Sequence, residues 1–415
     1  MNKQFTIGLF GIYGLYNFGC EAIVRGTYRL IKKTWPNSKV ILYTYRPCED
    51  SFIVQDLDIL CKKVPIHKLK LLRHIVNKFL SIISSKKRLS IWNAKAVAKE
   101  CDMVFSIGGD IYTIPKCILD QGKEQAYSPI VDFGKSVLKN IPLVIWGASI
   151  GPFGEKKQVK EYYFNHLKDV DQIFCREEMT YKYLKENNIT NNIQIIPDPA
   201  FYVRDSSGIR NDLSKNKSKV RVALNLSPLS VKEQVGVNDN QLKEQIINSV
   251  KDLLTIPNVE LVLVPHVLSP FSQMDNDLIF LKDIYSSLLD FKNEEHSIHL
   301  LEGCSGFIKI KRFLQTCDIV IAARMHCAIN AICEGIPTIF ITYSLKGTGM
   351  TSYIYGSSKW NIPIADIGKK LKNVTLELLS NKEMVSAQIK ERLKEIEKEE
   401  ARVINLLSKL SNTPK

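Results

Sequence analysis

The sequence predicts an α/β protein that contains two doubly wound parallel-sheet domains facing one cleft. Short apolar runs typical of buried strands recur along the 415 residues and alternate with helical stretches. This alternation occurs twice, on either side of a polar stretch between Arg204 and Lys219. Glycines or charged residues follow several of the strands directly, as they do where open parallel sheets bind ligands.

The first half of the chain has the pattern of one complete sheet. We expect a loop over 11–23 and a helix to about residue 33 after the first strand. We predict that residues 1–204 form the N-terminal domain. The expected strands are 5–10, 39–44, 103–107, 143–148, 173–175 and 193–196.

The second half repeats the pattern after a linker, which we place at 205–219. We predict a C-terminal domain at 220–368 and a charged, solvated helix at 369–415. Its expected strands are 220–225, 260–265, 298–300, 319–322 and 338–341, with helices near 240–255, 275–288 and 306–316.

The composition is that of a soluble globular protein, with 45% hydrophobic and 24% charged residues. Ten cysteines are scattered without a CxxC pair, which predicts reduced thiols and no metal site. The N-terminus lacks a signal-peptide pattern, and no run has the length of a membrane span. We therefore expect a cytoplasmic protein.

The net charge of +14 is concentrated in one segment. Residues 62–99 contain eleven Lys and Arg and no Asp or Glu, so the rest of the chain carries 14 − 11 = +3. Apolar residues between Leu69 and Ile83 recur at helical spacing. Two interpretations stay open, a core-facing helix with a solvated basic face or a peripheral seat on an anionic membrane. We expect no nucleic-acid partner.

The stretch from Asp318 to Tyr343 is the main candidate for a functional site. It predicts a strand, a tight junction and a helix, with Arg324, Met325 and His326 at the junction. A helix amino end there favours an anion, an arginine adds a fixed cationic fork, and a histidine carries a proton near neutral pH. Taken alone, an Arg or His at a strand end is more often a surface residue or a helix-cap partner.

Other strand ends supply further candidates. The loop over 11–23 resembles a phosphate-cradling loop but matches neither common glycine pattern, so it could be only a turn. Its candidate residues are Gly14, Asn17, Gly19 and Glu21. The candidates after the other strands are Gly108, Gly109, Asp110, Gly147, Arg176 and His266.

Six motifs in this order resemble the polysaccharide pyruvyl transferase family, whose members have a GT-B-like fold of two Rossmann-like domains. The resemblance covers nearly all of residues 5–350. The motifs are G-x-Y-G-x-x-N-x-G-C-E-A-I (11–23), I-G-G-D (107–110), W-G-A-S-I-G-P (146–152), C-R-E-E (175–178), P-D-P-A-F (197–201) and R-M-H-C-A-I-N-A-I-C-E-G-I-P (324–337).

The resemblance implies transfer of pyruvate from phosphoenolpyruvate to two hydroxyls of a sugar, as a ketal, in cell-surface or exopolysaccharide biosynthesis. It implies Arg176 and Arg324 as phosphoenolpyruvate ligands and His326 as the acid, with no cofactor and no metal. It also implies a sugar or lipid-linked oligosaccharide as the acceptor. We expect the acceptor on the side of the N-terminal domain and the donor on the side of the C-terminal domain. Lys346 lies where members often have a lysine.

One departure from the family pattern concerns the residue that takes the proton of the attacking sugar hydroxyl. Many members have Asp at the position of Cys20, which leaves Glu21 as the only carboxylate in the loop. A carboxylate such as Glu21 or Asp110 could take the proton of the attacking hydroxyl.

Two rival functions stay open. One is a GT-B glycosyltransferase that uses a nucleotide sugar, because Glu334 lies in a stretch similar to one that holds a ribose in such enzymes. Arg176 and Arg324 argue against it, since a nucleotide diphosphate at a helix end needs fewer arginines. The other is a non-catalytic scaffold at a site of membrane polysaccharide assembly.

Overall fold

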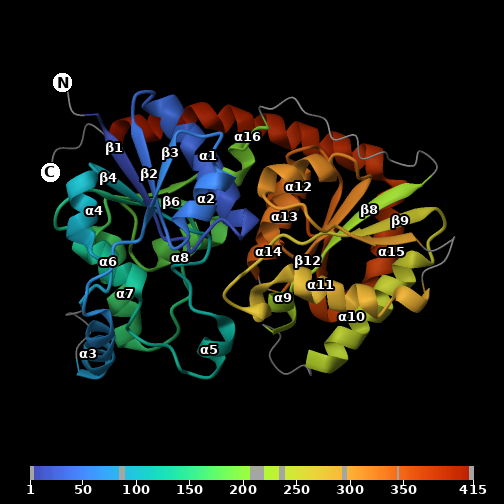
Figure 1. The fold of residues 1–415 in the computed structure, drawn as a ribbon, viewed down its shortest axis with the longest axis horizontal. Helices are drawn as coiled ribbons and strands as arrows, with labels where there is room; N and C mark the ends of the chain where they lie inside the picture. Colours follow the sequence, from blue (N-terminus) through green and yellow to red (C-terminus); the bar gives the residue numbers. More distant parts are fainter. Residues whose placement is uncertain are drawn as a thin grey trace. The chain divides into compact units, whose positions relative to one another are not determined.

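The structure, a computed structural model, describes residues 4–83, 89–205, 219–232, 239–291, 297–343 and 345–410. The chain folds into two compact units. The N-terminal unit comprises Met1–Leu15, Ile23–Tyr202 and Glu399–Lys415, and the C-terminal unit comprises Tyr16–Ala22 and Val203–Lys398. Each unit is built on its own parallel sheet with helices on both faces (Figure 1).

The described residues of the N-terminal unit form a seven-stranded sheet in the order β3-β2-β1-β4-β5-β6-β7. All of its ladders are parallel, and the central strands are buried along their whole length, because helices cover both faces. The strands are β1 (Thr6–Phe10), β2 (Lys39–Thr44), β3 (Ile59–Lys63), β4 (Met103–Ile107), β5 (Leu143–Ala148), β6 (Gln172–Cys175) and β7 (Ile193–Ile195).

The helices of this unit connect successive strands, as parallel pairing requires. They are α1 (Phe18–Thr34), α2 (Pro47–Ile53), α3 (Lys70–Ile83), α4 (Ala94–Glu100), α5 (Lys116–Asp120), α6 (Pro129–Val137), α7 (Lys157–Asp169) and α8 (Glu178–Glu186), followed by the 3₁₀ turn η1 (Pro199–Tyr202).

The described residues of the C-terminal unit form a six-stranded parallel sheet in the order β10-β9-β8-β11-β12-β13. Its strands are β8 (Val220–Asn225), β9 (Val259–Leu263), β10 (Ser297–Leu300), β11 (Ile319–Ala322), β12 (Thr338–Thr342) and β13 (Asn361–Pro363). Its helices are α9 (Pro228–Lys232), α10 (Asp239–Leu254), α11 (Asp277–Ser286), α12 (Phe307–Leu314), α13 (Met325–Ile332), α14 (Leu345–Tyr355), α15 (Ile367–Ser380) and α16 (Lys382–Leu410). Three short 3₁₀ turns complete it: η2 (Gln273–Asp275), η3 (Leu289–Phe291) and η4 (Ile364–Asp366).

The prediction of two doubly wound parallel sheets with a helical C-terminal tail is confirmed. Two edge strands, β3 and β13, escaped the sequence analysis because they are short and only partly buried, so their residues show no continuous apolar run. Most of the linker expected at 205–219 lies outside the described residues.

The C-terminal tail is less solvated than its charge suggested. Apart from Asn381, residues 369–410 belong to α15 and α16, and one face of each helix is buried. Residues Lys382–Lys398 of α16 belong to the C-terminal unit, and its last residues belong to the N-terminal unit. There Glu400 accepts hydrogen bonds from Arg29 and Lys33 on α1.

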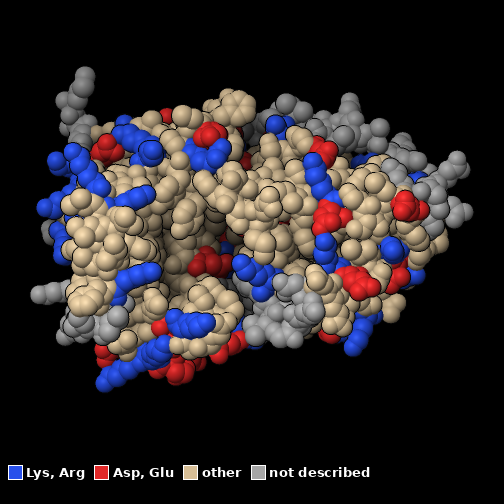
Figure 2. All heavy atoms as spheres, turned by 60° about the horizontal axis from the view of Figure 1, so that its bottom comes forward, with Lys and Arg blue, Asp and Glu red and all other residues tan. Residues whose placement is uncertain are grey.

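Charges of both signs share the surface of the C-terminal unit. Figure 2 shows its Lys and Arg side chains interspersed with Asp and Glu on the face drawn. No helix in the described part of the chain combines the length and the apolar character needed to cross a membrane.

Candidate active site

Arg324 lies at the junction between β11 and α13, two residues beyond the end of the strand. Its backbone N–H donates to the side-chain oxygen of Asn225, at 2.9 Å. Asn225 ends the neighbouring strand β8, and its amide nitrogen donates to the carbonyl of Val264, which follows β9. One buried asparagine therefore ties together the carboxyl ends of three adjacent strands.

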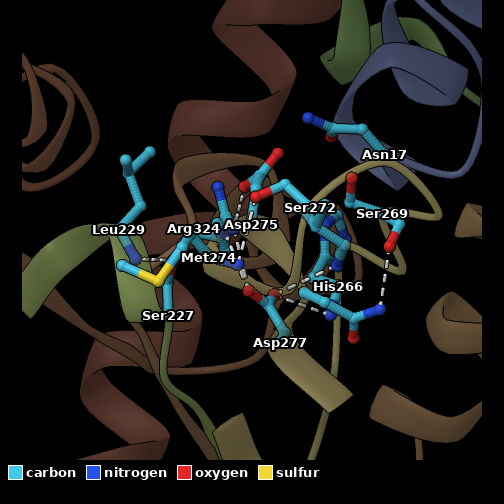
Figure 3. A network of polar contacts seen from close by, with 12 residues as sticks. Asn17, Ser227, Leu229, His266, Ser269, Ser272, Met274, Asp275, Asp277 and Arg324 are labelled. Carbon is cyan, nitrogen blue, oxygen red and sulfur yellow. Dashed lines mark hydrogen bonds and ion pairs between the residues drawn. The ribbon is translucent and has the colours of Figure 1, made fainter. Parts of the chain in front are cut away.

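Two carboxylates hold the guanidinium of Arg324 (Figure 3). Nε and Nη2 donate to Oδ1 of Asp277, at 3.1 and 2.9 Å, and Nη2 also donates to Asp275, at 2.7 Å. Asp277 is buried, and its Oδ2 accepts the backbone N–H groups of His266 and Val267, both at 3.0 Å. Its two oxygens therefore join the arginine to the end of β9.

These contacts decide the charge of the site. Burial alone would lower the pKa of Arg324, but Asp277 and Asp275 raise it above its ordinary value. One cation faces two carboxylates, so this group carries no net positive charge. Among the described residues, Nη1 is the guanidinium nitrogen that makes no hydrogen bond, and it is therefore the donor left for a ligand.

His326 occupies the second position of α13, and its imidazole lies against Gly19 at the start of α1. A Cβ placed on Gly19 would lie 2.5 Å from Nδ1 of His326, closer than side chains approach one another. Asn17 accepts the N–H of Gly19 through its side-chain oxygen, at 3.0 Å, and so fixes the start of the helix. Residues of two distant motifs therefore meet at the imidazole.

The loop that carries Asn17 and Gly19 belongs to the C-terminal unit, although it follows the first strand of the N-terminal sheet. Asn17 forms a β-bridge with Val267, and the N–H of Phe18 donates to the carbonyl of His266, at 3.1 Å. The N–H of Leu268 donates to the carbonyl of Tyr16, at 3.0 Å. These backbone bonds hold the loop beside His326.

His266, expected to bind substrate, is buried. Its ring lies edge-on to Phe18 and Phe307, and no described residue is hydrogen-bonded to Nε2. Burial, together with His326 and Arg324, lowers the pKa of His266 well below its ordinary value. The imidazole of His266 is therefore neutral and buried. The backbone carbonyl of His266 accepts the N–H of Phe18 and so helps to fix the loop that carries Asn17 and Gly19.

Glu21, one of the two candidate bases, is buried and caps another helix. Its Oε2 accepts the backbone N–H of Phe307, the first residue of α12, at 2.6 Å. Glu334, the predicted ribose ligand, lies within 2.6 Å of Lys311 and accepts a hydrogen bond from Gln315, at 2.7 Å. Both carboxylates therefore have protein partners.

Two other predicted residues lie close in the sequence. Met325 is the first residue of α13 and is half-buried. Lys346 belongs to α14, but its side chain lies outside the part of the chain that the structure describes.

Arg176 is the centre of a second network, in the N-terminal unit, at the carboxyl ends of four adjacent strands. It follows β6, and its guanidinium is buried. Nε and Nη2 donate to Oγ of Ser149, which follows β5, at 3.0 and 2.9 Å. Nη1 donates to Asp198, beyond β7, at 3.2 Å, and Nη2 donates to Asp110, beyond β4, at 3.3 Å.

The carboxylates of this network differ in exposure. Asp198 is buried and also accepts the N–H of Ala200, whereas 64% of the Asp110 side chain is exposed. Burial alone would lower the pKa of Arg176, but Asp110 and Asp198 raise it. Asp110 is therefore the carboxylate of the pair that can reach a substrate.

The predicted glycines shape these strand ends. A Cβ on Gly109 would lie 2.7 Å from Nη1 of Arg176, so only glycine lets the guanidinium pack there. Gly108 and Gly147 both have positive φ, and Gly147 packs against Pro199. Gly14 is buried in the loop after β1.

Several site residues escaped the sequence analysis. Asp198 and Ser149 lie inside quoted motifs, and Asp275 and Asp277 lie near His266, but none was named as a site residue. For Ser149 and Asp198 the available signal was a polar residue shortly after a strand, and for Asn225 it was an amide at a strand end. Asp275 and Asp277 lie well beyond the end of β9 and carried no such signal. Among the described residues, no group of three or more His, Cys, Asp or Glu side chains is arranged to hold a metal ion.

Comparison with known proteins identifies the family. A family model described as "Polysaccharide pyruvyl transferase" matches residues 17–344, most of the chain, including both the Asn17–Gly19 loop and the Arg324–His326 junction. The chain belongs to this family.

A curated relative is consistent with this family. The amylovoran biosynthesis protein AmsJ of Erwinia amylovora is 22% identical over 268 residues. This match covers 61% of the chain and 59% of AmsJ, so the chain spans less than two thirds of that relative's length.

Solved structures share the fold at low identity. The Anabaena protein Alr3699/HepE, solved with UDP and glucose, has a TM-score of 0.59 at 11% identity and covers 99% of this chain and 100% of its own. A UDP-N-acetylglucosamine 2-epimerase described as putative, from Listeria monocytogenes, has a TM-score of 0.57 at 15% identity and covers 94% and 91%. These structural neighbours confirm the GT-B-like fold that the sequence predicted for this chain.

Proposed function

We propose that this chain transfers the pyruvyl group of phosphoenolpyruvate to two hydroxyls of a sugar in polysaccharide biosynthesis, leaving a cyclic ketal and phosphate. The observation that carries this proposal is the packing of Gly19 against His326 beside the anchored Arg324. It joins the two motifs of the family match around one imidazole, which is the group a protonation step needs.

The donor fits the C-terminal unit by its chemistry. The first-turn N–H groups of a helix have no intrahelical partner and favour an anion, and α13 presents that turn at the end of β11. Nη1 of Arg324 adds one charge-assisted donor to a phosphate or carboxylate oxygen. Asp277 and Asp275 hold the remaining nitrogens, so the arginine positions one donor instead of supplying a two-armed clamp.

His326 delivers a proton to the methylene carbon of phosphoenolpyruvate, which becomes a methyl group while positive charge develops at the adjacent carbon. One sugar hydroxyl attacks that carbon, the carbon–oxygen bond to phosphate breaks, and the second hydroxyl closes the ketal. Of the two hydroxyl protons, one leaves on hydrogen phosphate and the other restores His326.

Two stacked tyrosines in the N-terminal unit form an aromatic surface that suits a sugar acceptor. Tyr13 follows β1 and is 59% exposed, and its ring stacks on Tyr45, which follows β2, at 5.3 Å and 20°. Trp92 donates to the hydroxyl of Tyr45, at 2.9 Å, and holds the pair in place. An exposed aromatic face at the carboxyl edge of a parallel sheet suits the C–H face of a pyranose.

The Arg176 network supplies polar groups at the same sheet edge. Its exposed carboxylate, Asp110, is the candidate that takes one of the two hydroxyl protons and passes it on to the departing phosphate, since Glu21 is occupied with α12. We propose Asp110 as the base and Arg176 as the group that orients it. The direct contact of Arg176 with phosphoenolpyruvate, implied by the family resemblance, is tested with Arg176→Lys. Loss of phosphoenolpyruvate affinity, measured by calorimetry, would support that contact, and an unchanged affinity would contradict it.

Two measurements test the proposal. The first is phosphate release from phosphoenolpyruvate in the presence of free and lipid-linked glycans, which we expect only with a suitable acceptor. The second is the melting temperature with phosphoenolpyruvate or with UDP, since a ligand that binds the folded state raises it. Stabilisation by UDP alone, with no phosphate release, would favour the nucleotide-sugar glycosyltransferase. A lack of response to both ligands would favour the scaffold.

A further inference from the structure

Helix α3 (Lys70–Ile83) presents its apolar side outward. Leu71, Leu72, Ile75 and Phe79 lie on one side of this helix, and their side chains are 54–72% exposed. Leu69, just before the helix, is 64% exposed as well. The interpretation of α3 as a core-facing helix is therefore wrong.

The side of α3 that faces the protein is polar. Asn77 is fully buried and exchanges two hydrogen bonds with the backbone of Leu89, at 2.7 and 2.8 Å. Arg73 donates to the carbonyl of Ser90, at 3.0 Å, and His74 shares a hydrogen bond with the hydroxyl of Tyr127, at 2.6 Å. These directed bonds fix the rotation of the helix, which inverts the usual pattern of a surface helix.

The charged residues of the segment that contains α3 all have one sign. Lys68, Lys70 and Lys78 are exposed on or beside α3, and residues 62–99 contain no Asp or Glu. Figure 1 shows α3 at the lower edge of the N-terminal unit, apart from the sheet. A row of exposed Leu, Ile and Phe flanked by lysines matches a helix that lies in the plane of a membrane interface.

We propose that α3 docks on an anionic lipid bilayer. Leu71, Leu72, Ile75 and Phe79 enter the boundary of the acyl chains, and the lysines meet the lipid headgroups. A bilayer is favoured over a protein partner because residues 62–99 contain eleven Lys and Arg and no Asp or Glu, a charge pattern that is complementary to a uniformly anionic surface. The inference stands independently of the proposed reaction.

The test is co-sedimentation of the full chain with vesicles of phosphatidylcholine containing about 30% phosphatidylglycerol, at low and at high salt. We expect binding at low salt, weaker binding at high salt, and little binding to pure phosphatidylcholine. Ile75→Ser with Phe79→Ser should weaken binding roughly tenfold or more. Lys70→Gln with Lys78→Gln should weaken it by about fivefold per lysine.

Phe52→Ser is the matched control, because Phe52 is also largely exposed in the same unit but lies on α2. It should bind vesicles like the wild type. As a second readout, the Phe79→Trp variant should show a blue-shifted emission on vesicles that contain phosphatidylglycerol, and brominated lipids should quench it.

Three outcomes would overturn the proposal. One is no binding by the wild type to anionic vesicles at low salt. Another is binding that both α3 variants leave unchanged while the emission of the Phe79→Trp variant stays the same. The third is a dimer in solution that Ile75→Ser with Phe79→Ser dissociates in the absence of vesicle binding, which would assign this side to a second copy of the chain.

Discussion

Gly19 lies so close to the imidazole of His326 that a Cβ on it would be 2.5 Å from Nδ1. The two residues are far apart in the sequence, and both lie in the C-terminal unit. The start of α1 thus forms a wall of the histidine site, and the absence of a side chain there sets the position of the ring.

Gly19→Ala should move the imidazole of His326 and lower kcat by about tenfold to a hundredfold, because small displacements of a reacting group are costly. Gly368→Ala on α15 is the control, since its nearest neighbour, Ser249, lies 3.8 Å from the added Cβ. The control should keep full activity and gain up to about 1 kcal/mol of stability. Equal activity in the two variants would contradict the role of Gly19.

His326→Gln should slow the chemical step by about 10²–10⁴-fold, because glutamine cannot deliver a proton to the methylene carbon. Phosphoenolpyruvate affinity, measured by calorimetry, should change little. Single-turnover phosphate release separates the two effects, and near-normal release would rule out His326 as the acid.

Asp275→Asn and Asp277→Asn should have opposite effects on donor binding. Asp275 is partly exposed, so removing its charge should strengthen phosphoenolpyruvate binding by about fivefold, the effect of one unit charge at short range in water. Asp277 is buried and holds both Arg324 and the N–H groups of His266 and Val267. Its substitution should weaken binding and cost about 3 kcal/mol of stability, measured by urea unfolding. Weaker binding by both variants would show that Arg324 needs both carboxylates to be positioned.

Tyr13→Ala should raise the KM for the acceptor by about three- to tenfold, because the sugar loses an aromatic contact. The KM for phosphoenolpyruvate should stay unchanged. Phe52→Ala is the control, with similar exposure on α2, and should alter neither constant. A change in donor KM alone would place Tyr13 outside the acceptor site.

His166→Leu should make the protein less sensitive to acid. His166 is buried in the N-terminal unit, and burial lowers its pKa to about 3, with Lys135 adding to the effect. In the unfolded chain His166 therefore binds a proton near pH 6.5, whereas in the folded chain its imidazole stays neutral at that pH. The wild type keeps this stability above about pH 6.5 and loses it as the pH falls toward 3, by up to about 1.4 kcal/mol per pH unit. Urea unfolding between about pH 7 and 4.5 should show a shallower decline for the variant, and parallel curves would contradict this origin.

The sequence alone determined the two sheets and the location of their ligand edges. Buried parallel strands are continuous apolar runs, and the residue after each run must lie at the carboxyl edge, so Arg176, Arg324 and Asp110 could be placed at strand ends. The strands β3 and β13 could not be found this way. Their side chains are partly exposed to solvent, so these edge strands contain no continuous apolar run.

Only the tertiary structure decided what these residues contact. Asp277 neutralises Arg324, and Glu21 caps α12, because each carboxylate reaches a donor far away in the chain. The loop at Tyr16–Ala22 joins the C-terminal unit through backbone bonds that have no periodic signature. Helical spacing defined the apolar side of α3 but not its direction, since a periodic pattern is the same whether that side faces core or solvent. The buried hydrogen bonds of Asn77 turn it outward.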